Sequence, residues 1–272
     1  MTDILPYAEV IGDPIAHSKS PLIHNFWLKA NGMEGDYRLA HVLPENLESF
    51  IAQRKADSAW RGCNVTIPHK VAVMDFVADP GGVKDTIGAM NTVIRQPDGE
   101  LVGTNTDAAG FYAPISEVNL EGAPVVVIGA GGASRAVLFA LARAGVGEVT
   151  ILNRSPLKAM GLLATFGLKG NVLALDATLP PAALVVNSSS LGMKGQPPLE
   201  IDLSPLPDDA IVYDLVYAPL ETGLLKQAAQ RGLSTIDGLD MLIGQAAMAF
   251  ELFFGKAPPQ DRDDELRALL TA

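Results

Sequence analysis

Residues 125–136 read VVVIGAGGASRA, and this stretch decides the fold. Four consecutive β-branched residues at 125–128 are typical of a strand that is buried on both faces. The glycine-rich run at 129–132 predicts a tight turn, and the alanine-rich run at 133–144 predicts a helix. A strand, a glycine turn and a helix in this order place backbone N–H groups and the positive end of the helix where a pyrophosphate binds. This order therefore favours a dinucleotide site over a plain connection, although Ser134 stands where the generic pattern has Gly or Ala.

The next predicted strand, at 148–152, indicates which dinucleotide binds. NAD-binding folds of this type usually end that strand in Asp or Glu, which holds the ribose 2′-hydroxyl. Here the strand ends in Asn153, Arg154 and Ser155, with Lys158 one helical turn further on. A carboxylate would repel a 2′-phosphate, whereas Arg holds one through charge-assisted hydrogen bonds. We therefore predict NADP(H); the alternative is that Ser155 only caps the next helix, as we also expect it to do, and that Arg154 is solvated.

Composition bounds the class of protein. The chain has 272 residues, of which 48% are hydrophobic and 19% charged, as expected of a well-buried α/β protein with one large or two ordinary domains. The formal net charge of −11 argues against nucleic acid and anionic membranes as partners. Cys63 is the only cysteine, so neither an internal disulfide nor a zinc–thiolate cluster is expected. The four histidines show no metal-ligand spacing, and no stretch reads as a leader or a membrane span, so we expect no metal and a cytoplasmic protein.

The first part of the chain predicts strands at 8–12, 36–41 and 60–66 and helices after Ser20 and at 45–54. Ser20 followed by proline is typical of a helix N-cap. Ser18 is not needed for that cap, and two hydroxyls beside a helix N-terminus can also hold a carboxylate. A cap and a carboxylate site are equally compatible with the local sequence. Pro68 predicts the start of a helix whose first turn carries Lys70. A lysine is electrostatically unfavourable there, which suggests a functional role, although an exposed lysine would be tolerated at little cost.

Beyond residue 90, segments 91–95 and 101–105 flank a Pro-Asp-Gly turn signal and predict a hairpin. A helix is expected from Asp107 to residue 118, and in isolation Asp107 reads as its N-cap. Alternating helices (156–166, 222–231) and strands (183–186, 211–215, 234–236) then predict a doubly wound parallel sheet. The polar runs 187–190 and 214–217 fall at carboxyl ends of strands, where such sheets bind ligands. Helices at 238–254 and 262–270 complete two α/β units, joined near 107 and 238, with a cleft expected between them.

Several segments, in the same order and over nearly the whole chain, resemble those of the shikimate dehydrogenase family. They are GDP at 12–14 with HSKSP at 17–21, NVTIPHK at 64–70, GAMNT at 88–92, GTNTD at 103–107, GAGGASRA at 129–136, NRS at 153–155, and GLDML at 238–242 with Gln245. Each segment alone is a weak signal, and together they are specific. Two positions depart from the commonest family pattern, since Ser155 replaces a frequent Thr and Leu215 a frequent Met.

The resemblance implies a two-domain α/β enzyme. Residues 1–106, completed by the C-terminal helices at 238–272, would form an α/β substrate-binding domain, and residues 107–237 a Rossmann-like NADP-binding domain. The implied reaction is the reversible reduction of 3-dehydroshikimate to shikimate with NADPH, in the shikimate pathway toward chorismate and aromatic amino acids. The implied partners are these small molecules, in a monomer or a homodimer.

The resemblance also assigns roles by position. Lys70 and Asp107 are the implied catalytic pair, because a developing alkoxide at C3 needs a positioned proton donor and Asp107 can orient the lysine. The implied substrate contacts are Ser18, Ser20 and Tyr217 at the carboxylate, and Thr66, Asn91, Asp107 and Gln245 at the ring hydroxyls and the C3 oxygen. The implied cofactor contacts are Gly129, Ala130, Gly131, Gly132, Ala133, Asn153, Arg154, Ser155 and Lys158, with Leu215 and Gly238 near the nicotinamide.

Two other functions remain open from the sequence. A sibling enzyme of the same fold would act on quinate or an aminated shikimate analogue, and one ring substituent separates these substrates. A non-catalytic ligand sensor would keep the fold, but it would have no need for both Lys70 and Asp107.

Overall fold

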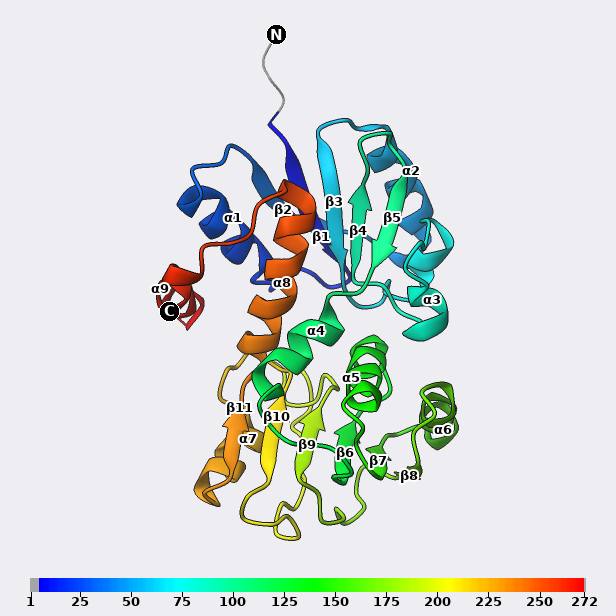
Figure 1. Cartoon of the computed structure of the whole chain (residues 1–272), viewed down its shortest axis with the longest axis vertical. Coiled ribbons are helices and arrows are strands. Elements are labelled where there is room, and N and C mark those ends of the chain that lie inside the picture. Colours follow the sequence, from blue (N-terminus) through cyan, green and yellow to red (C-terminus); the bar gives the residue numbers. More distant parts are fainter. Residues whose placement is uncertain (1–4, 272) are drawn as a thin grey trace. The chain divides into compact units, whose positions relative to one another are not determined.

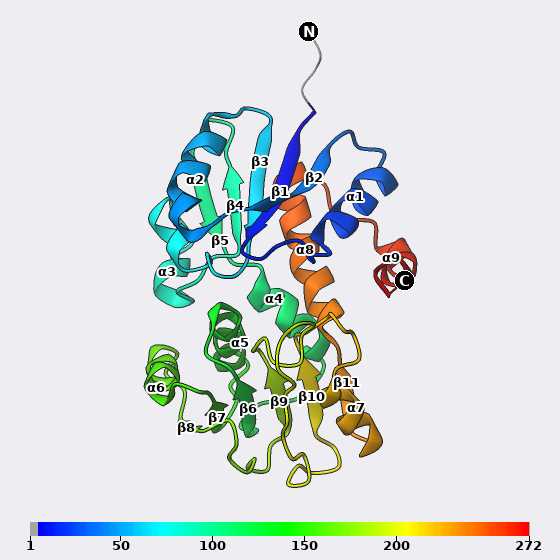
Figure 2. The ribbon, with the colours of Figure 1, turned by 180° about the vertical axis from the view of Figure 1, so that it is seen from behind.

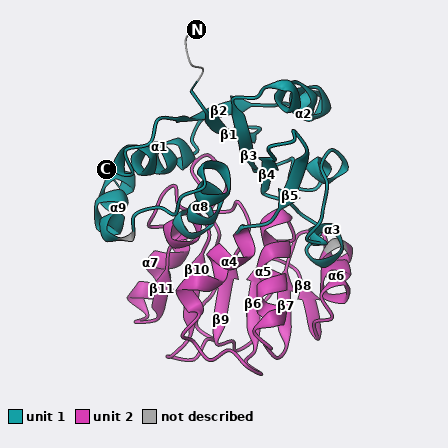
Figure 3. Cartoon of the chain, turned by 45° about the horizontal axis from the view of Figure 1, so that its top comes forward, with its two compact units in different colours: residues 1–106, 243–272 teal, residues 107–242 magenta. Residues whose placement is uncertain are grey.

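The structure, a computed structural model, describes residues 5–271 except the side chains of Lys158 and Gln260. The chain forms two compact units (Figure 3): unit 1 is Met1–Thr106 with Ile243–Ala272, and unit 2 is Asp107–Leu242. The sequence places the first boundary at the same residue and the second at 237/238. The second boundary instead falls inside helix α8 (Gly238–Phe254), because Met241 packs in the core of unit 2 and Phe253 in that of unit 1.

Unit 1 is built on a five-stranded sheet in the order β2-β1-β3-β4-β5 (Figure 1). The first three strands of this order run parallel, and β3, β4 and β5 are antiparallel. The β4–β5 hairpin confirms the Pro-Asp-Gly signal, with Gly99 at a φ of +88°. The strands are β1 (Tyr7–Gly12), β2 (Asp36–His41), β3 (Trp60–Val65), β4 (Thr92–Arg95) and β5 (Leu101–Thr104). The helices are α1 (Ser20–Ala30), α2 (Leu47–Ala56), α3 (Val83–Thr86) and α9 (Asp263–Thr271), with 3₁₀ turns at Pro44–Asn46, Ala72–Asp75 and Gln260–Arg262.

Alternate residues of β1 face opposite sides of this sheet. Ala8 and Val10 pack with Phe253 of α8. Glu9 is 2% exposed, and its carboxylate accepts a hydrogen bond at 2.5 Å from the Arg54 guanidinium of α2. The guanidinium supplies the counter-charge that a buried carboxylate requires, so α2 is held to the sheet by an ion pair as well as by apolar contacts.

Unit 2 is built on a six-stranded parallel sheet in the order β11-β10-β9-β6-β7-β8 (Figure 2). Numbered from β6 and read from β8, this is the order 3-2-1-4-5-6 of doubly wound dinucleotide-binding folds, which confirms the predicted fold class. The strands are β6 (Val125–Ile128), β7 (Val149–Leu152), β8 (Gly170–Leu173), β9 (Leu184–Asn187), β10 (Ile211–Asp214) and β11 (Ser234–Ile236). The helices are α4 (Asp107–Tyr112), α5 (Gly132–Arg143), α6 (Pro156–Thr165) and α7 (Gly223–Gln230), with a 3₁₀ turn at Ala113–Ile115.

Strand β6 is buried on both faces, as its run of β-branched residues predicts. Val125 and Val127 belong to one apolar cluster, with residues of α4, α5 and α6. Val126 and Ile128 belong to a second cluster, with residues of α7. Helices thus cover both faces of the sheet, and the glycine turn begins at the carboxyl end of β6.

Some local predictions are wrong. No α-helix begins at Pro68; residues 67–71 form a turn, because the Lys70 carbonyl accepts the Met90 N–H at 2.7 Å and is drawn into a long-range contact instead of a helix. The helix expected at 107–118 ends at Tyr112, where Pro114 lacks an N–H, and the helix expected at 45–54 begins at Leu47. Strand β8, a short and largely exposed edge strand, was not predicted because GNVL has little apolar alternation.

His24 of α1 is a fully buried titratable residue in the core of unit 1. Both ring nitrogens are without a partner among the described residues, and the ring stacks on Tyr37 at 3.9 Å. Burial lowers the pKa of His24 from 6.5 to about 3. The folded protein therefore holds a neutral imidazole where the unfolded chain binds a proton.

This difference makes stability depend on pH. Because the unfolded state binds the extra proton between pH 6.5 and about 3, the free energy of unfolding should fall as pH drops through that window. From pH 7 to 4.5 the wild type should lose about 2.5 kcal/mol more than His24→Phe, which has no proton to bind. Urea unfolding at the two pH values measures this, with the exposed His17→Gln variant as control. An equal loss in wild type and His24→Phe would contradict the assignment.

Candidate functional site

The turn after β6 has the shape that the sequence predicts. Gly129 has a φ of +110°, and a Cβ there would lie 3.1 Å from the Ser189 nitrogen at the end of β9. Only glycine fits this position, so the backbone closes tightly against the neighbouring strand. Helix α5 starts at Gly132, and the first N–H groups of a helix lack intrahelical partners. The turn therefore presents donors and a helix dipole to an anion, which fits a dinucleotide pyrophosphate.

The end of β7 carries no carboxylate. Arg154 is exposed and forms no ion pair with any residue that the structure describes. Ser155 stands at the N-cap of α6 and is followed by Pro156, as the sequence predicts, but its hydroxyl makes no cap hydrogen bond. Asn153 Nδ2 donates to the Ser155 carbonyl at 2.9 Å and orders the segment. The side chain of Lys158 lies outside the described residues.

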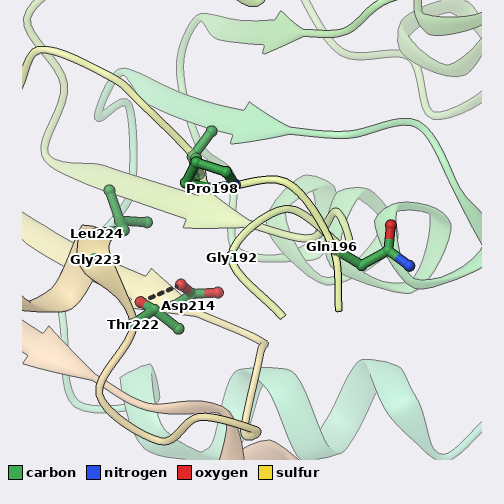
Figure 4. Close-up of a pocket in the computed structure, with 8 residues that line it drawn as sticks. Gly192, Gln196, Pro198, Asp214, Thr222, Gly223 and Leu224 are labelled. Atoms are coloured by element: carbon green, nitrogen blue, oxygen red, sulfur yellow. Dashed lines mark hydrogen bonds between the residues drawn. The ribbon is translucent and has the colours of Figure 1, made fainter. Parts of the chain in front are cut away.

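A buried polar cluster joins the ends of β9 and β10, where the sequence has the polar runs 187–190 and 214–217. The Asp214 carboxylate accepts hydrogen bonds from Asn187 Nδ2 at 2.8 Å, from the Val216 N–H at 3.0 Å and from the Thr222 hydroxyl at 2.7 Å. Burial raises the pKa of Asp214, while these three donors act in the opposite direction. Figure 4 shows the Asp214–Thr222 bond beside a cavity of about 200 Å³. The signal in the sequence was the polar residues at two strand ends, which showed the place but not the partners.

The residues expected near the nicotinamide come together within unit 2. A Cβ at Gly238 would collide with the backbone of Leu215 and Val216, so the start of α8 packs directly on the segment that Asp214 holds. Tyr217, half-buried, follows in the same segment. Asp107, 4% exposed, is the first residue of α4.

In unit 1 the two candidate serines of the carboxylate site contact each other. The Ser18 hydroxyl accepts the Ser20 N–H at 3.3 Å and donates to the Ser20 hydroxyl at 3.2 Å. Ser20 is the first residue of α1, and the N-cap position falls on Lys19, with no side-chain cap. Of the two alternatives that the sequence leaves open for Ser20, the helix cap is therefore wrong, and Ser18 satisfies a backbone N–H there.

The turn that carries Lys70 is held by its neighbours. Thr66 accepts the His69 N–H on its carbonyl at 2.9 Å, and the buried His69 ring contacts the Val42 carbonyl through Nε2 at 2.7 Å. With the Lys70 carbonyl also bonded to Met90, the backbone on both sides of the lysine is fixed. The half-buried Lys70 side chain extends from this anchored turn.

Asn91 lies in a buried amide and hydroxyl cluster. Its Oδ1 accepts the Thr106 N–H at 2.7 Å and the Thr92 hydroxyl at 3.1 Å, and its Nδ2 donates to the Thr106 hydroxyl at 2.9 Å and to Gln245 Oε1 at 3.4 Å. Asn64 joins from β3, donating to the Thr92 hydroxyl at 3.1 Å. The structure thus brings together Asn91 and Gln245, two predicted substrate contacts that are far apart in the sequence.

Among residues 5–271, no group of three or more His, Cys, Asp or Glu side chains is placed to hold a metal ion. No helix in the described part of the chain combines the length and apolar character that crossing a membrane requires.

Three family models match the chain. Residues 10–93 match the shikimate dehydrogenase substrate binding domain, residues 113–190 match shikimate/quinate 5-dehydrogenase, and residues 238–263 match the shikimate 5′-dehydrogenase C-terminal domain.

Full-length relatives agree with these matches. A shikimate dehydrogenase (NADP(+)) from Sphingopyxis alaskensis is 76% identical, with 98% of this chain and 97% of the relative covered. The Thermus thermophilus shikimate 5-dehydrogenase structure in complex with NADP(H) and shikimate is 36% identical, with a TM-score of 0.86 over 98% of this chain and 100% of that one. A quinate dehydrogenase from Corynebacterium glutamicum, in complex with NAD, is 30% identical, with a TM-score of 0.88 and coverage of 97% and 99%. By this near-full-length identity, the chain belongs to the shikimate dehydrogenase family.

Proposed function

We propose that this chain catalyses the reversible, NADPH-dependent reduction of 3-dehydroshikimate to shikimate. The observation that carries the proposal is the 76% identity, over 98% of the chain, to a relative named shikimate dehydrogenase (NADP(+)). The Thermus structure in complex with NADP(H) and shikimate supports the choice of ligands. The reaction belongs to the biosynthetic route that the sequence resemblance implies, and we assign the protein to the cytoplasm.

Each unit has its own part in this proposal. Unit 1 would bind the substrate, since residues 10–93 match a substrate binding domain and the Ser18–Ser20 pair and the Asn91 cluster lie within it. Unit 2 would bind the cofactor, since it contains the glycine turn. The cofactor contacts would be the turn at 129–133, the segment at 153–158, and Leu215 with Gly238.

The residues that would read the adenosine ribose favour NADP(H) over NAD(H). The exposed Arg154 guanidinium, which forms no ion pair with the described residues, offers five donors and a permanent charge to a 2′-phosphate. The uncommitted Ser155 hydroxyl adds a neutral donor. This strand end carries no carboxylate, so it has no negative charge that would repel the phosphate. With a net charge of −11, the protein must attract this dianion by local groups such as Arg154, against its overall field.

The proposed chemistry assigns one proton transfer to the chain. Bound NADPH supplies the hydride that adds to the C3 carbonyl carbon, and negative charge then develops on the carbonyl oxygen. Lys70 donates the proton that completes the hydroxyl, and its positive charge stabilises the developing alkoxide. The family resemblance gives Asp107 the role of orienting this lysine. In the reverse direction the same lysine, after losing its proton, takes the hydroxyl proton back.

A sibling activity is the second candidate, since the quinate dehydrogenase structure has the same fold. NADPH oxidation measured side by side with 3-dehydroshikimate and 3-dehydroquinate separates the two. The proposal expects turnover with 3-dehydroshikimate at a kcat/KM at least about fivefold higher, because one unsatisfied buried polar group costs roughly 1–3 kcal/mol. Preference for 3-dehydroquinate, or binding without turnover of either, would contradict it.

Light scattering in solution would decide between a monomer and a homodimer.

The cofactor assignment makes a mutational prediction. Arg154→Ala should weaken NADPH binding at least about tenfold, since a hydrogen bond to a charged group contributes roughly 1.5–3 kcal/mol. NADH lacks the 2′-phosphate, so its binding should be nearly unaffected. Calorimetric titration of both cofactors measures this, with Arg143→Ala, an exposed arginine of α5, as the matched control. Equal losses for NADPH and NADH would show that the guanidinium does not read the phosphate.

The catalytic assignment makes a second prediction. Lys70→Met removes the proton and the charge, and kcat should fall by about 10²–10⁴, the usual share of general acid catalysis, while NADPH still binds. Asp107→Asn should also lower kcat, although Asn would serve as well as Asp at a helix start. The double variant should lose little beyond the worse single variant, because residues that act as a unit are not additive.

The exposed Lys55→Met is the control for the lysine change. Near-normal turnover in Lys70→Met, or simple additivity of the two losses, would remove the pair from the mechanism.

A further inference from the structure

Beneath the glycine turn lies a pair of serines to which neither the sequence reading nor the family match gives a role. Ser134 is fully buried in the first turn of α5, and Ser188, 8% exposed, follows β9. Their hydroxyl oxygens lie 2.9 Å apart. Two polar side chains are thus buried together at the point where the strand, the turn and the helix meet.

The direction of each hydrogen bond in this pair is determined. The Ser188 hydroxyl donates a hydrogen bond at 2.8 Å to the carbonyl of Ile128, which is the last residue of β6. A serine has one hydroxyl proton, so Ser188 accepts the bond from Ser134. The hydroxyl proton of Ser134 is thus engaged with Ser188, and the Ser134 oxygen accepts a hydrogen bond from the Gly131 N–H at 2.9 Å. The result is a continuous chain from the Gly131 amide through Ser134 and Ser188 to the Ile128 carbonyl.

We propose that Ser134 and Ser188 are positioning residues that turn the Gly131 N–H inward, so that the pyrophosphate is received by the N–H groups of Gly132 and Ala133 instead. The inference rests on the proposed function, since it concerns how the cofactor is held. The two ends of the chain of bonds flank the turn, because Ile128 precedes it and Gly131 ends it. This series of hydrogen bonds therefore fixes the width of the turn before any ligand binds, which lowers the entropy cost of binding.

The inference explains the residue at which the sequence departs from the generic pattern. In G-x-G-x-x-G/A turns the last position is small so that helix and strand pack closely. A methyl or a hydrogen there would leave the Gly131 N–H and the Ser188 oxygen without their partner. Here the space is filled by a hydroxyl that is bonded on both sides.

Ser134→Ala is a sharp test, because the two views predict opposite results. It restores the generic pattern, and on the pattern alone binding should be unchanged or tighter. On our inference, the dissociation constants of NADPH and NADH should both rise about five- to tenfold, since one hydrogen bond of this kind changes an affinity by roughly that factor at most. Both cofactors are affected equally, because the turn holds the pyrophosphate that they share. Shikimate binding, assigned to unit 1, should stay within about twofold.

Three further measurements make the test independent of folding and of turnover. Ser188→Ala should weaken the binding of both cofactors about two- to threefold. The double variant should lose no more than about twofold in affinity beyond Ser134→Ala, because the two hydroxyls belong to one series of hydrogen bonds. Amide exchange of Gly131, followed by NMR without cofactor, should speed up in Ser134→Ala. Ser116→Ala, which removes a serine hydroxyl bond from a surface turn of the same unit, is the matched control.

Unchanged cofactor affinity and unchanged Gly131 exchange in Ser134→Ala would overturn the inference while leaving the proposed function intact. Wild-type protein that binds neither cofactor would overturn the proposed function and, with it, the role given to the pair. If Ser134→Ala does not fold, Ser188→Ala carries the same comparison, and equal binding to wild type in that variant would contradict the inference.

Discussion

The close approach of Gly129 to the end of β9 is the constraint on which unit 2 depends. A side chain at this position would press against the backbone of Ser188 and Ser189, and the positive φ excludes most residues regardless of space. Because β6 lies between β7 and β9, the turn that leaves it is bordered by the ends of both neighbours. One glycine thus lets the start of α5, the segment after β7 and the polar end of β9 meet at a single edge.

Unit 1 solves a different problem with different residues. Its candidate substrate groups are mainly neutral hydroxyls and amides, such as the Ser18–Ser20 pair and the Asn91–Gln245 pair, which are bonded to one another in the structure. Neutral donors and acceptors give directional binding, and they leave Lys70 as the charged group of its turn. Buried polar networks of this kind are stable only when each member has its hydrogen bonds. Thr92 donates to Asn91, and Asn64 in turn donates to Thr92.

The sequence predicted those features whose signal is local. The β-branched run, the glycine turn and the alternation of elements gave the doubly wound sheet, and the Pro-Asp-Gly signal gave the hairpin, because each depends on residues close in the chain. The turn at Lys70 was misread as a helix because its backbone bonds to Met90, a contact that no local pattern contains. Neither Ser20 nor Ser155 makes a cap hydrogen bond, for a similar reason: a hydroxyl has several possible partners, and long-range structure decides among them. The chain through Ser134 and Ser188 joins residues 54 apart, and it became visible only in the structure.

The most direct measurement is a crystal structure of this protein with NADP⁺ and shikimate bound. The account predicts the 2′-phosphate at Arg154 and the pyrophosphate on the N–H groups of Gly132 and Ala133, with the Gly131 N–H still bonded to Ser134. It also predicts the shikimate carboxylate at the hydroxyls of Ser18 and Ser20 and the C3 hydroxyl at Lys70. A 2′-phosphate away from Arg154, or shikimate held by neither the serines nor Lys70, would contradict it.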